Sequence, residues 1–251
     1  MGSTIPTSAA GVDAAFDELV KLGDVLAVWA HPDDETYLAG GLLAALRDLG
    51  HRVVCVTATR GEAADPAATS DERAALAAVR TEELQAALGT LGVAEHQWLD
   101  YPDGGCADLD PDGPVERLAA LLAEVRPRTV VTFGPDGFTG HPDHRTVSTW
   151  TDLALARVGL TPRVLHPVAL EHPPDSELDD DLGVFELGRP RVCTDEELAL
   201  QLRLAGAALE RKVEALLRQA SQTQGLVTAV GRERFSAWVA TESFALPLAT
   251  T

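Results

Sequence analysis

Apolar runs of strand length alternate with segments of helical periodicity along most of this chain. Val25–Ala30 (VLAVWA) is continuously apolar, as expected for a strand buried on both faces. Further strands are predicted at Arg52–Thr57, His96–Leu99, Thr129–Phe133 and Arg163–Ala169. Helices are predicted between them at Thr36–Leu49, Ser70–Leu91, Val115–Val125 and Asp143–Ala156. Regular alternation of this kind predicts an α/β fold with a mainly parallel sheet and right-handed crossovers.

No internal repeat or low-complexity linker divides the 251 residues, so we expect one domain over 1–251. Residues 1–20 are predicted to form a polar lead-in that runs into a short helix. The acidic, proline-containing segment 171–181 is predicted to be an exposed loop. Thr194–Ala220 is predicted to be one long helix, with Thr194 as its N-cap.

The charge balance of the chain narrows the classes of partner. The net charge is −19, from 20 basic and 39 acidic residues. Such a surface repels phosphate backbones and anionic lipids, which argues against nucleic acid and membrane surfaces as partners. The 18 Arg against two Lys, with abundant Ala, are typical of a GC-rich bacterial gene. We therefore expect a small-molecule partner, and the sequence is compatible with a homo-oligomer.

Compartment is predicted from what the sequence lacks. The apolar stretches fall far short of the roughly 20 residues of a membrane span. Residues 1–10 lack the charged start and apolar core of a signal peptide. The three cysteines include no close pair, which argues against a disulfide scaffold or an all-Cys zinc site. We therefore expect a cytoplasmic protein.

Four polar clusters follow predicted strands. In an open α/β sheet, ligands bind beyond the carboxyl ends of the strands, so these clusters are expected to converge at one edge. The clusters are His31–Glu35 (HPDDE), Thr59–Glu62, Tyr101–Gly104 and Gly140–His144 (GHPDH).

The first and last clusters together supply the donors of a catalytic metal site. Such a zinc site uses three N or O ligands and keeps one open position. His31 and Asp34 are three residues apart, as are His141 and His144, so each pair can point the same way at the start of a helix. Two imidazoles and one carboxylate would then bind the metal, which lowers the pKa of its water to roughly 7. Asp33 and one remaining His would be free for proton transfer.

These residues carry a family resemblance. Ala30–Glu35 and Gly140–His144 resemble the two signature motifs of the PIG-L/LmbE-like zinc N-deacetylases, and the likeness runs from about Asp24 to Gln222. The family includes deacetylases of N-acetylglucosaminyl-phosphatidylinositol and of mycothiol and bacillithiol precursors. The resemblance implies a Rossmann-like three-layer α/β/α fold and hydrolysis of the N-acetyl amide of an N-acetylglucosamine-type conjugate. It also implies zinc as the metal, with Fe²⁺ as the alternative.

The resemblance assigns roles residue by residue. His31, Asp34 and His144 would hold the zinc. Asp33 would be the general base, and His141 would stabilise the tetrahedral intermediate or protonate the leaving amine.

Three further positions are assigned in the same way. Asp143 would tune and orient His141. Arg80, with Glu83, resembles the family's Arg-x-x-Glu, and Asp103 its Pro-Asp-Gly turn. In members that process sugars, the positions of Arg80 and Asp103 contact the glycan.

Two positions depart from the family pattern. Some members have a Tyr before the Gly-His step, where this chain has Thr139. Lys212 with Ser221-Gln222 resembles a Lys…His-x-Ser-Gln pattern, but Gln219 stands where the His is usual. The resemblance therefore leaves open what replaces that Tyr and that His.

Several alternatives remain at this level. Asp33 and Asp143 also suit helix caps, Arg80 an exposed salt-bridging face, and Asp103 an ordinary turn. A site of two imidazoles and one carboxylate also occurs in non-haem Fe(II) oxygenases, and a non-catalytic metal- or sugar-binding module would need neither Asp33 nor His141. Mycothiol-type, bacillithiol-type, phosphatidylinositol-linked and antibiotic-linked sugars all fit the same metal core.

Overall fold

The computed structural model describes residues 12–13, 16–172 and 175–248. Its helices are α1 (Phe16–Leu22), α2 (Asp34–Asp48), α3 (Ser70–Leu91), α4 (Asp112–Val125), α5 (Gly137–Gly140), α6 (Pro142–Val158), α7 (Ser176–Asp181), α8 (Gly206–Arg218), α9 (Ala220–Val230) and α10 (Arg232–Trp238). Its strands are β1 (Val12–Asp13), β2 (Val25–Trp29), β3 (Val53–Thr59), β4 (Glu95–Tyr101), β5 (Thr129–Thr132), β6 (Arg163–Pro167), β7 (Ala169–Leu170), β8 (Val192–Cys193), β9 (Leu200–Leu204) and β10 (Thr241–Ala245).

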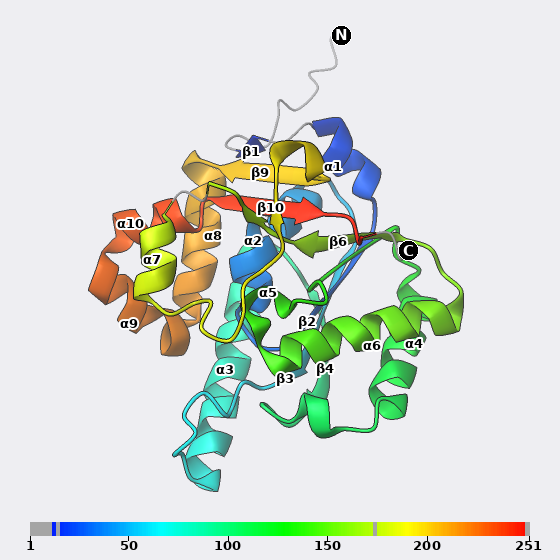
Figure 1. Cartoon of the computed structure of the whole chain (residues 1–251), viewed down its shortest axis with the longest axis horizontal. Helices are drawn as coiled ribbons and strands as arrows, with labels where there is room; N and C mark the ends of the chain where they lie inside the picture. Colours follow the sequence, from blue (N-terminus) through cyan, green and yellow to red (C-terminus); the bar gives the residue numbers. More distant parts are fainter. Residues whose placement is uncertain (1–11, 14–15, 173–174, 249–251) are drawn as a thin grey trace.

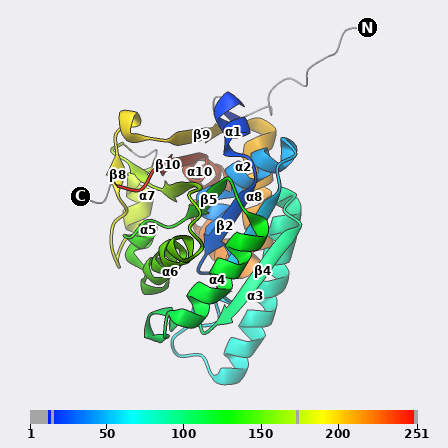
Figure 2. The ribbon, with the colours of Figure 1, turned by 90° about the vertical axis from the view of Figure 1, so that its right-hand side faces the viewer.

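The main sheet lies between two layers of helices (Figure 1). Over the described residues its strand order is β1-β9-β10-β6-β5-β2-β3-β4. The run from β6 to β4 is parallel, and β10, β9 and β1 pair antiparallel beyond it. Helices α2, α3 and α8 pack together on one face, and α4 packs on α6 on the other (Figure 2). This architecture confirms the predicted α/β class with a mainly parallel sheet.

The central strands form because their sequences bury both faces. Every residue of β2 and β3 is buried, and the two strands pair in register from Val25↔Val53 to Trp29↔Thr57. Trp29 packs edge-on against Phe133, with ring centroids 5.1 Å apart. Continuous apolar strands of this kind need helices on both faces, which fixes the three-layer arrangement.

The prediction of one long helix over Thr194–Ala220 is wrong. Thr194 is the N-cap of a single 3₁₀ turn, Asp195–Glu197, and not of a long helix. The next residues form β9, and α8 begins only at Gly206. Leu200, Leu202 and Leu204 alternate with polar residues and are buried, so their period of two decides for a strand.

The prediction of an exposed loop over 171–181 is also wrong for its second half. Glu171 and His172 are exposed, and residues 173 and 174 lie outside the described residues. Ser176–Asp181 forms α7, and Asp175 caps it by accepting from the Leu178 N–H at 3.1 Å. The buried side chain of Leu178 anchors this short acidic helix. In the lead-in, the expected short helix is found as α1.

A buried ion pair ties α8 to the sheet and to α2. Lys212 Nζ lies 2.7 Å from Glu242 Oε1, and both side chains are fully buried. Lys212 also donates to the Tyr37 carbonyl at 2.8 Å. Glu242 accepts from the Gly41 and Leu42 N–H groups at 2.7 and 2.9 Å. The pair therefore holds the helix that follows the HPDDE motif against β10.

Across the part of the chain that the structure describes, each helix is too short or too polar to cross a bilayer.

Removing one partner of the buried pair should destabilise the fold strongly. We expect Lys212→Met to lower the free energy of unfolding by about 3–5 kcal/mol, because Glu242 would keep a buried, uncompensated charge. Urea denaturation monitored by circular dichroism measures the change. Arg232→Met, which breaks exposed pairs with Glu210 and Glu214, is the control and should cost about 0–1 kcal/mol. Equal losses in the two variants would contradict the assigned role of the buried pair.

Candidate active site

The HPDDE segment turns directly from β2 into α2. Asp33 is the N-cap residue of α2, with φ 99° and ψ −29°, and its side chain makes no cap hydrogen bond. A non-glycine residue at positive φ is strained, and such strain gathers at functional sites. The His31 N–H donates to Asp34 Oδ2 at 2.8 Å, which closes the turn. The Asp33 carboxylate is therefore free for another contact, unlike that of an ordinary cap residue.

Three side chains from the two motifs converge beyond the end of β2. His31 Nδ1 lies 3.0 Å from His144 Nε2 and 3.6 Å from Asp34 Oδ2. Asp34 Oδ1 lies 3.4 Å from His144 Nε2. A tetrahedral zinc with ligands at 2.0–2.2 Å places its ligand atoms about 3.4 Å apart. All three residues are largely buried, and Asp34 approaches the two imidazoles with different oxygens. The ring nitrogens of His31, His141 and His144 form one group close enough to hold a metal ion, and Asp34 as a ligand stays a prediction.

His144 is oriented by its surroundings. Its ring stacks on Phe133, with centroids 4.1 Å apart and an interplanar angle of 14°. Its Nδ1 lies 2.9 Å from the Gly137 carbonyl and 3.3 Å from Thr139 Oγ1, so Nε2 faces His31. Burial lowers the pKa of His144 to about 4. A neutral imidazole with its second nitrogen fixed is the form that ligates metals.

His31 is held from its other nitrogen by two carboxylates. Its Nε2 lies 3.0 Å from Asp103 Oδ1 and 3.3 Å from Asp143 Oδ2. Burial by itself lowers the pKa of His31, but hydrogen bonds to these carboxylates outweigh it and raise the pKa to about 10. Carboxylates in this position orient a ligating imidazole and increase its basicity.

Asp143, which was expected to tune and orient His141, directs its carboxylate at His31. Asp143 Oδ2 contacts His31 and also accepts from the Gly104 N–H at 2.8 Å, and Oδ1 accepts from the Cys106 N–H at 3.1 Å. Instead, the Asp143 backbone N–H donates to His141 Nδ1 at 3.2 Å. The sequence alone could not reveal this, because the loop after β4 supplies the two N–H groups that turn the carboxylate toward His31.

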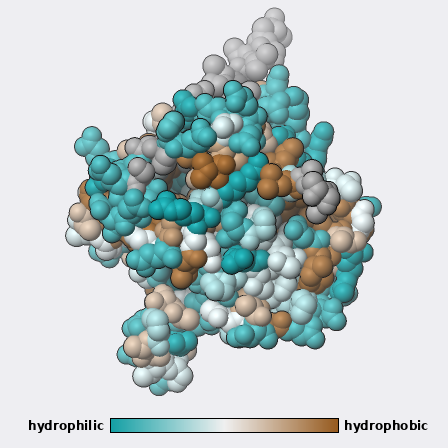
Figure 3. Space-filling model, viewed as in Figure 1, coloured by the Kyte–Doolittle hydropathy of each residue, from teal (hydrophilic) through white to brown (hydrophobic). Residues whose placement is uncertain are grey.

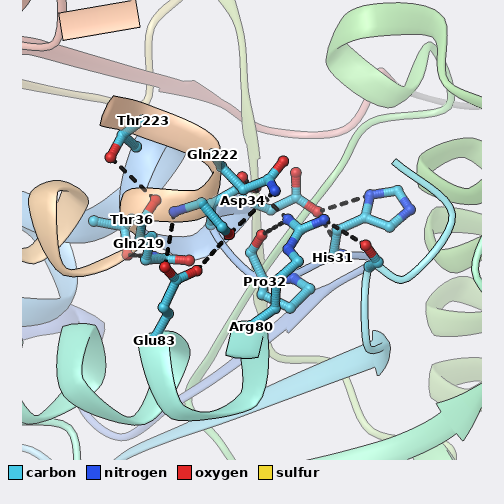
Figure 4. A network of polar contacts seen from close by, with 12 residues as sticks. His31, Pro32, Asp34, Thr36, Arg80, Glu83, Gln219, Gln222 and Thr223 are labelled. Atoms are coloured by element: carbon cyan, nitrogen blue, oxygen red, sulfur yellow. Dashed lines mark hydrogen bonds and ion pairs between the residues drawn. The ribbon is translucent and has the colours of Figure 1, made fainter. Parts of the chain in front are cut away.

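Asp33 and Arg80 form a partly buried pair. The Arg80 guanidinium lies beside Pro32 and His31 (Figure 4). Arg80 Nη2 lies 3.2 Å from Asp33 Oδ2, and Nη1 donates to the Gly61 carbonyl at 2.8 Å. Burial raises the pKa of Asp33 to about 8, against the opposing charge of Arg80. Gly61 has φ +68°, and a Cβ there would overlap the Arg80 guanidinium.

Arg80 is thus a buried residue of the site and not part of an exposed face. The guanidinium packs against the HPDDE turn, where it also donates to the Pro32 carbonyl. Asp103 is held by the Ala63 N–H, which donates to its Oδ2 at 2.7 Å. The contacts of Arg80 and Asp103 are with Asp33 and His31, and a glycan contact by either residue stays a prediction.

His141 completes a group of three imidazoles. Its ring meets His31 edge-on with centroids 4.8 Å apart and lies 5.0 Å from the ring of His144. Burial lowers the pKa of this half-buried ring. His141 therefore places a titratable ring beside both His31 and His144.

Gln219, where the family usually has His, belongs to a buried network behind the motif (Figure 4). Its Nε2 donates to Glu35 Oε1 and to Thr36 Oγ1, each at 3.0 Å. Burial raises the pKa of Glu35 to about 7, and hydrogen bonds from Thr36 and Gln219 oppose the rise. The Asp33 N–H donates to Glu35 Oε2 at 3.0 Å, so the network supports the strained turn. Sequence analysis assigned no role to Glu35, although its place within HPDDE was the available signal.

An apolar pocket of about 300 Å³ opens beside Asp34 and His144. Its walls come from segments far apart in the chain: α2, the loops around α5 and α7, β7, and the α10–β10 turn. We call it the aromatic pocket. It is lined in particular by Tyr37, Phe138, Val168, Leu170, Val184, Phe185 and Trp238. Sequence analysis missed the pocket, because no single segment carries its pattern.

Comparison with known proteins agrees with the resemblance. The family model described as PIG-L, GlcNAc-PI de-N-acetylase matches residues 26–155. A 1D-myo-inositol 2-acetamido-2-deoxy-alpha-D-glucopyranoside deacetylase of Kineococcus radiotolerans is 36% identical over 170 residues, which cover 57% of this chain and 47% of that protein. A Corynebacterium glutamicum protein of the same name is 31% identical over 222 residues, covering 79% and 74%. The chain thus spans about half the length of the first relative and about three quarters of the second.

A solved structure agrees in fold. The N,N'-diacetylchitobiose deacetylase of Pyrococcus horikoshii superposes with a TM-score of 0.63 and 21% sequence identity. The superposition covers 92% of this chain and 86% of that one. The likeness confirms the predicted three-layer α/β arrangement.

Replacing Gln219 by Leu should destabilise the protein in a pH-dependent way. The folded-state pKa of Glu35 is raised to about 7, so the stability that its protonated form contributes is lost as pH rises from about 4.3 through 7. Removing the Gln219 amide makes that loss larger. We expect a decrease of about 1–3 kcal/mol in the free energy of unfolding, greater near about pH 8 than near about pH 5, by urea denaturation.

Gln224→Leu on the exposed side of α9 is the control, and its effect should stay within about 0.5 kcal/mol at either pH. A pH-independent loss at Gln219 would contradict the assigned support of the Glu35 carboxylate.

Proposed function

The chain belongs to the PIG-L (GlcNAc-PI de-N-acetylase) family, and on this premise we propose that it hydrolyses the N-acetyl amide of an N-acetylated amino sugar, releasing acetate and a free amine. The observation that carries the proposal is the convergence of His31, Asp34 and His144, with Asp33 and His141 beside them. The substrates named for the Kineococcus and Corynebacterium relatives support an N-acetylglucosamine conjugate as the substrate class. We further propose residues 1–251 as one catalytic domain. The proposed ligands, and the residues that hold the HPDDE turn in place, come from elements between β2 and β10.

Zinc is the proposed metal, with Fe²⁺ as the alternative, and His31, Asp34 and His144 would hold it. When bound, it supplies a Lewis acid that polarises the amide carbonyl and acidifies water at neutral pH. The side chains present support this proposal, because two imidazole nitrogens and one carboxylate oxygen are ordinary ligands of catalytic zinc.

Asp33 is the proposed general base. Its pKa, raised by burial to about 8, lies near neutral pH, where a base transfers protons most effectively. It would accept a proton from the attacking water as the water oxygen bonds to the acetyl carbon. Arg80 keeps the carboxylate in place and partly ionised. The helix-cap alternative has no support, since the Asp33 side chain caps nothing in α2.

His141 is the proposed acid for the second half of the reaction. As the carbon–nitrogen bond breaks, the amine nitrogen must gain a proton. The half-buried imidazole of His141 lies beside the rings of His31 and His144, within reach of a substrate held there. Asp143 and Asp103 would act differently, by fixing the ring of His31.

A direct assay tests the proposed function. The purified protein, loaded with zinc or Fe²⁺, should release amine and acetate from N-acetylglucosamine conjugates that include an inositol glycoside and diacetylchitobiose. Dialysis against a chelator should abolish the activity, and added metal should restore it. His144→Ala should weaken metal binding by at least about 100-fold. Stoichiometric metal without amine release on any conjugate would refute the proposal, and substrate-dependent oxygen consumption would indicate an oxygenase.

Asp33→Asn should separate catalysis from metal binding. We expect kcat to fall by about 10²–10⁴-fold, because the amide cannot take a proton from water. Metal content, measured by mass spectrometry, should be unchanged. Asp48→Asn at the exposed end of α2 makes the same chemical change away from the site and should leave kcat unaltered. Full activity in Asp33→Asn would show that the base is another group.

A further inference from the structure

The proposed function leaves the aromatic pocket without a role. Its volume of about 300 Å³ is about twice that of an engineered apolar cavity of about 150 Å³ that holds a benzene molecule. One acetyl methyl group cannot fill such a space. Because the pocket adjoins Asp34 and His144, a substrate held beside these residues can extend into it.

We propose, building on the proposed function, that the aromatic pocket binds the acyl chain of the substrate, and that the preferred substrates are amino sugars N-acylated with linear chains of about four to eight carbons. The reaction is the same hydrolysis. The water oxygen bonds to the acyl carbon, the carbon–nitrogen bond breaks, the nitrogen takes the proton, and a short fatty acid and the amine leave.

The lining of the pocket suits an apolar chain and not a sugar. Its walls are mainly aromatic and aliphatic, with the hydroxyl groups of Thr139, Thr241 and Ser243 among them. Three carboxylates of the lining are engaged within the protein. Asp179 Oδ1 accepts from Trp238 Nε1 at 2.8 Å, and Asp175 pairs with Arg234 at 2.7 Å. Glu242 is the partner of Lys212 in the buried pair. A sugar would have to place its hydroxyl groups against hydrocarbon, whereas an alkyl chain would lose only water.

The geometry of an amide assigns the pocket to the acyl side. A secondary amide is trans, so its acyl chain and its nitrogen substituent leave the C–N bond in opposite directions. Asp103 and Asp143 contact His31, and the ring of His141, the proposed acid for the nitrogen, lies 4.8 Å from that of His31 and 5.0 Å from that of His144. Neither His31 nor His141 lines the pocket, whereas Asp34 and His144 do. With the sugar on the side of His141, the acyl chain points into the pocket.

One wall of the pocket is maintained at an energetic cost. Phe138 has φ 61° and ψ −56°, a backbone conformation that a bulky residue rarely adopts and that costs about 1–3 kcal/mol. Asp136 Oδ1 accepts from its N–H at 2.6 Å, and its ring lies 6.0 Å from that of Phe185. On the opposite wall, Tyr37 packs edge-on against Trp238 with centroids 5.9 Å apart. The pocket is therefore preformed, as ligand sites usually are.

The face shown in Figure 3 is mostly hydrophilic, and its hydrophobic residues form separate small groups, so this face offers no docking site for a protein. A site for a protein would need a broader contiguous apolar patch.

A chain-length series tests the inference. Zinc-loaded wild-type protein is assayed on N-acetyl-, N-butyryl-, N-hexanoyl- and N-octanoyl-glucosamine, and kcat/KM should rise by up to about fourfold for each methylene that enters the pocket. Val184→Trp, which narrows the pocket, should lower the ratio of hexanoyl to acetyl activity at least about tenfold. Val20→Trp on the exposed side of α1 is the matched control and should leave the ratio unchanged.

A second arm distinguishes the acyl side from the sugar side and does not depend on any variant. Hexanoate should inhibit wild-type deacetylation more strongly than acetate does, whereas hexyl and methyl glycosides of N-acetylglucosamine should react equally well. Acetyl hydrolysis with no gain along the acyl series, or a gain only along the glycoside series, would overturn the acyl assignment and leave the proposed function intact. No hydrolysis of any amide would overturn both.

Discussion

The left-handed backbone at Asp33 is the constraint on which the rest of the site depends. It turns the chain from the end of β2 into α2 within a few residues, so that His31 and Asp34 meet while the Asp33 side chain points elsewhere. An ordinary N-cap would use the Asp33 carboxylate on the helix N–H groups. Here that carboxylate faces Arg80, and the helix start is supported from behind by Glu35.

Such a strained turn persists because its surroundings hold it in place. Gln219 reaches Glu35 and Thr36 from the start of α9, and Lys212 with Glu242 fixes the middle of α2 against β10. The helices that supply these contacts pack on the same face of the sheet as α2. Residues of the C-terminal region therefore support the HPDDE motif by holding its turn and the following helix in place. Gln219 suits this role, because its amide donates to the Glu35 carboxylate and the Thr36 hydroxyl together.

The candidate site is chemically two-sided. On one side lie the groups that handle charge and protons: Arg80, Asp103, Asp143 and His141. On the other side lies the aromatic pocket, with hydrocarbon walls and carboxylates already bonded to Trp238 and Arg234. An amide has the same division, since its nitrogen must be protonated and its acyl chain stays apolar. This match between the asymmetry of the site and that of the bond is the basis for assigning each half of the substrate.

The sequence by itself determined the parts that depend on neighbouring residues. The apolar runs of β2 and β3, the helical periodicity of α3, and the two motifs after β2 and before α6 are local patterns. They predicted the α/β class and the candidate ligand residues. Only the tertiary structure decided the strand β9 where a helix was expected, because pairing with β10 and burial of alternate leucines outweigh helix propensity. It also decided that Asp143 serves His31, and that Tyr37, Phe185 and Trp238 share one pocket. Those contacts join segments more than 100 residues apart, or depend on loop N–H groups, and no local pattern encodes which of many distant partners a side chain will meet.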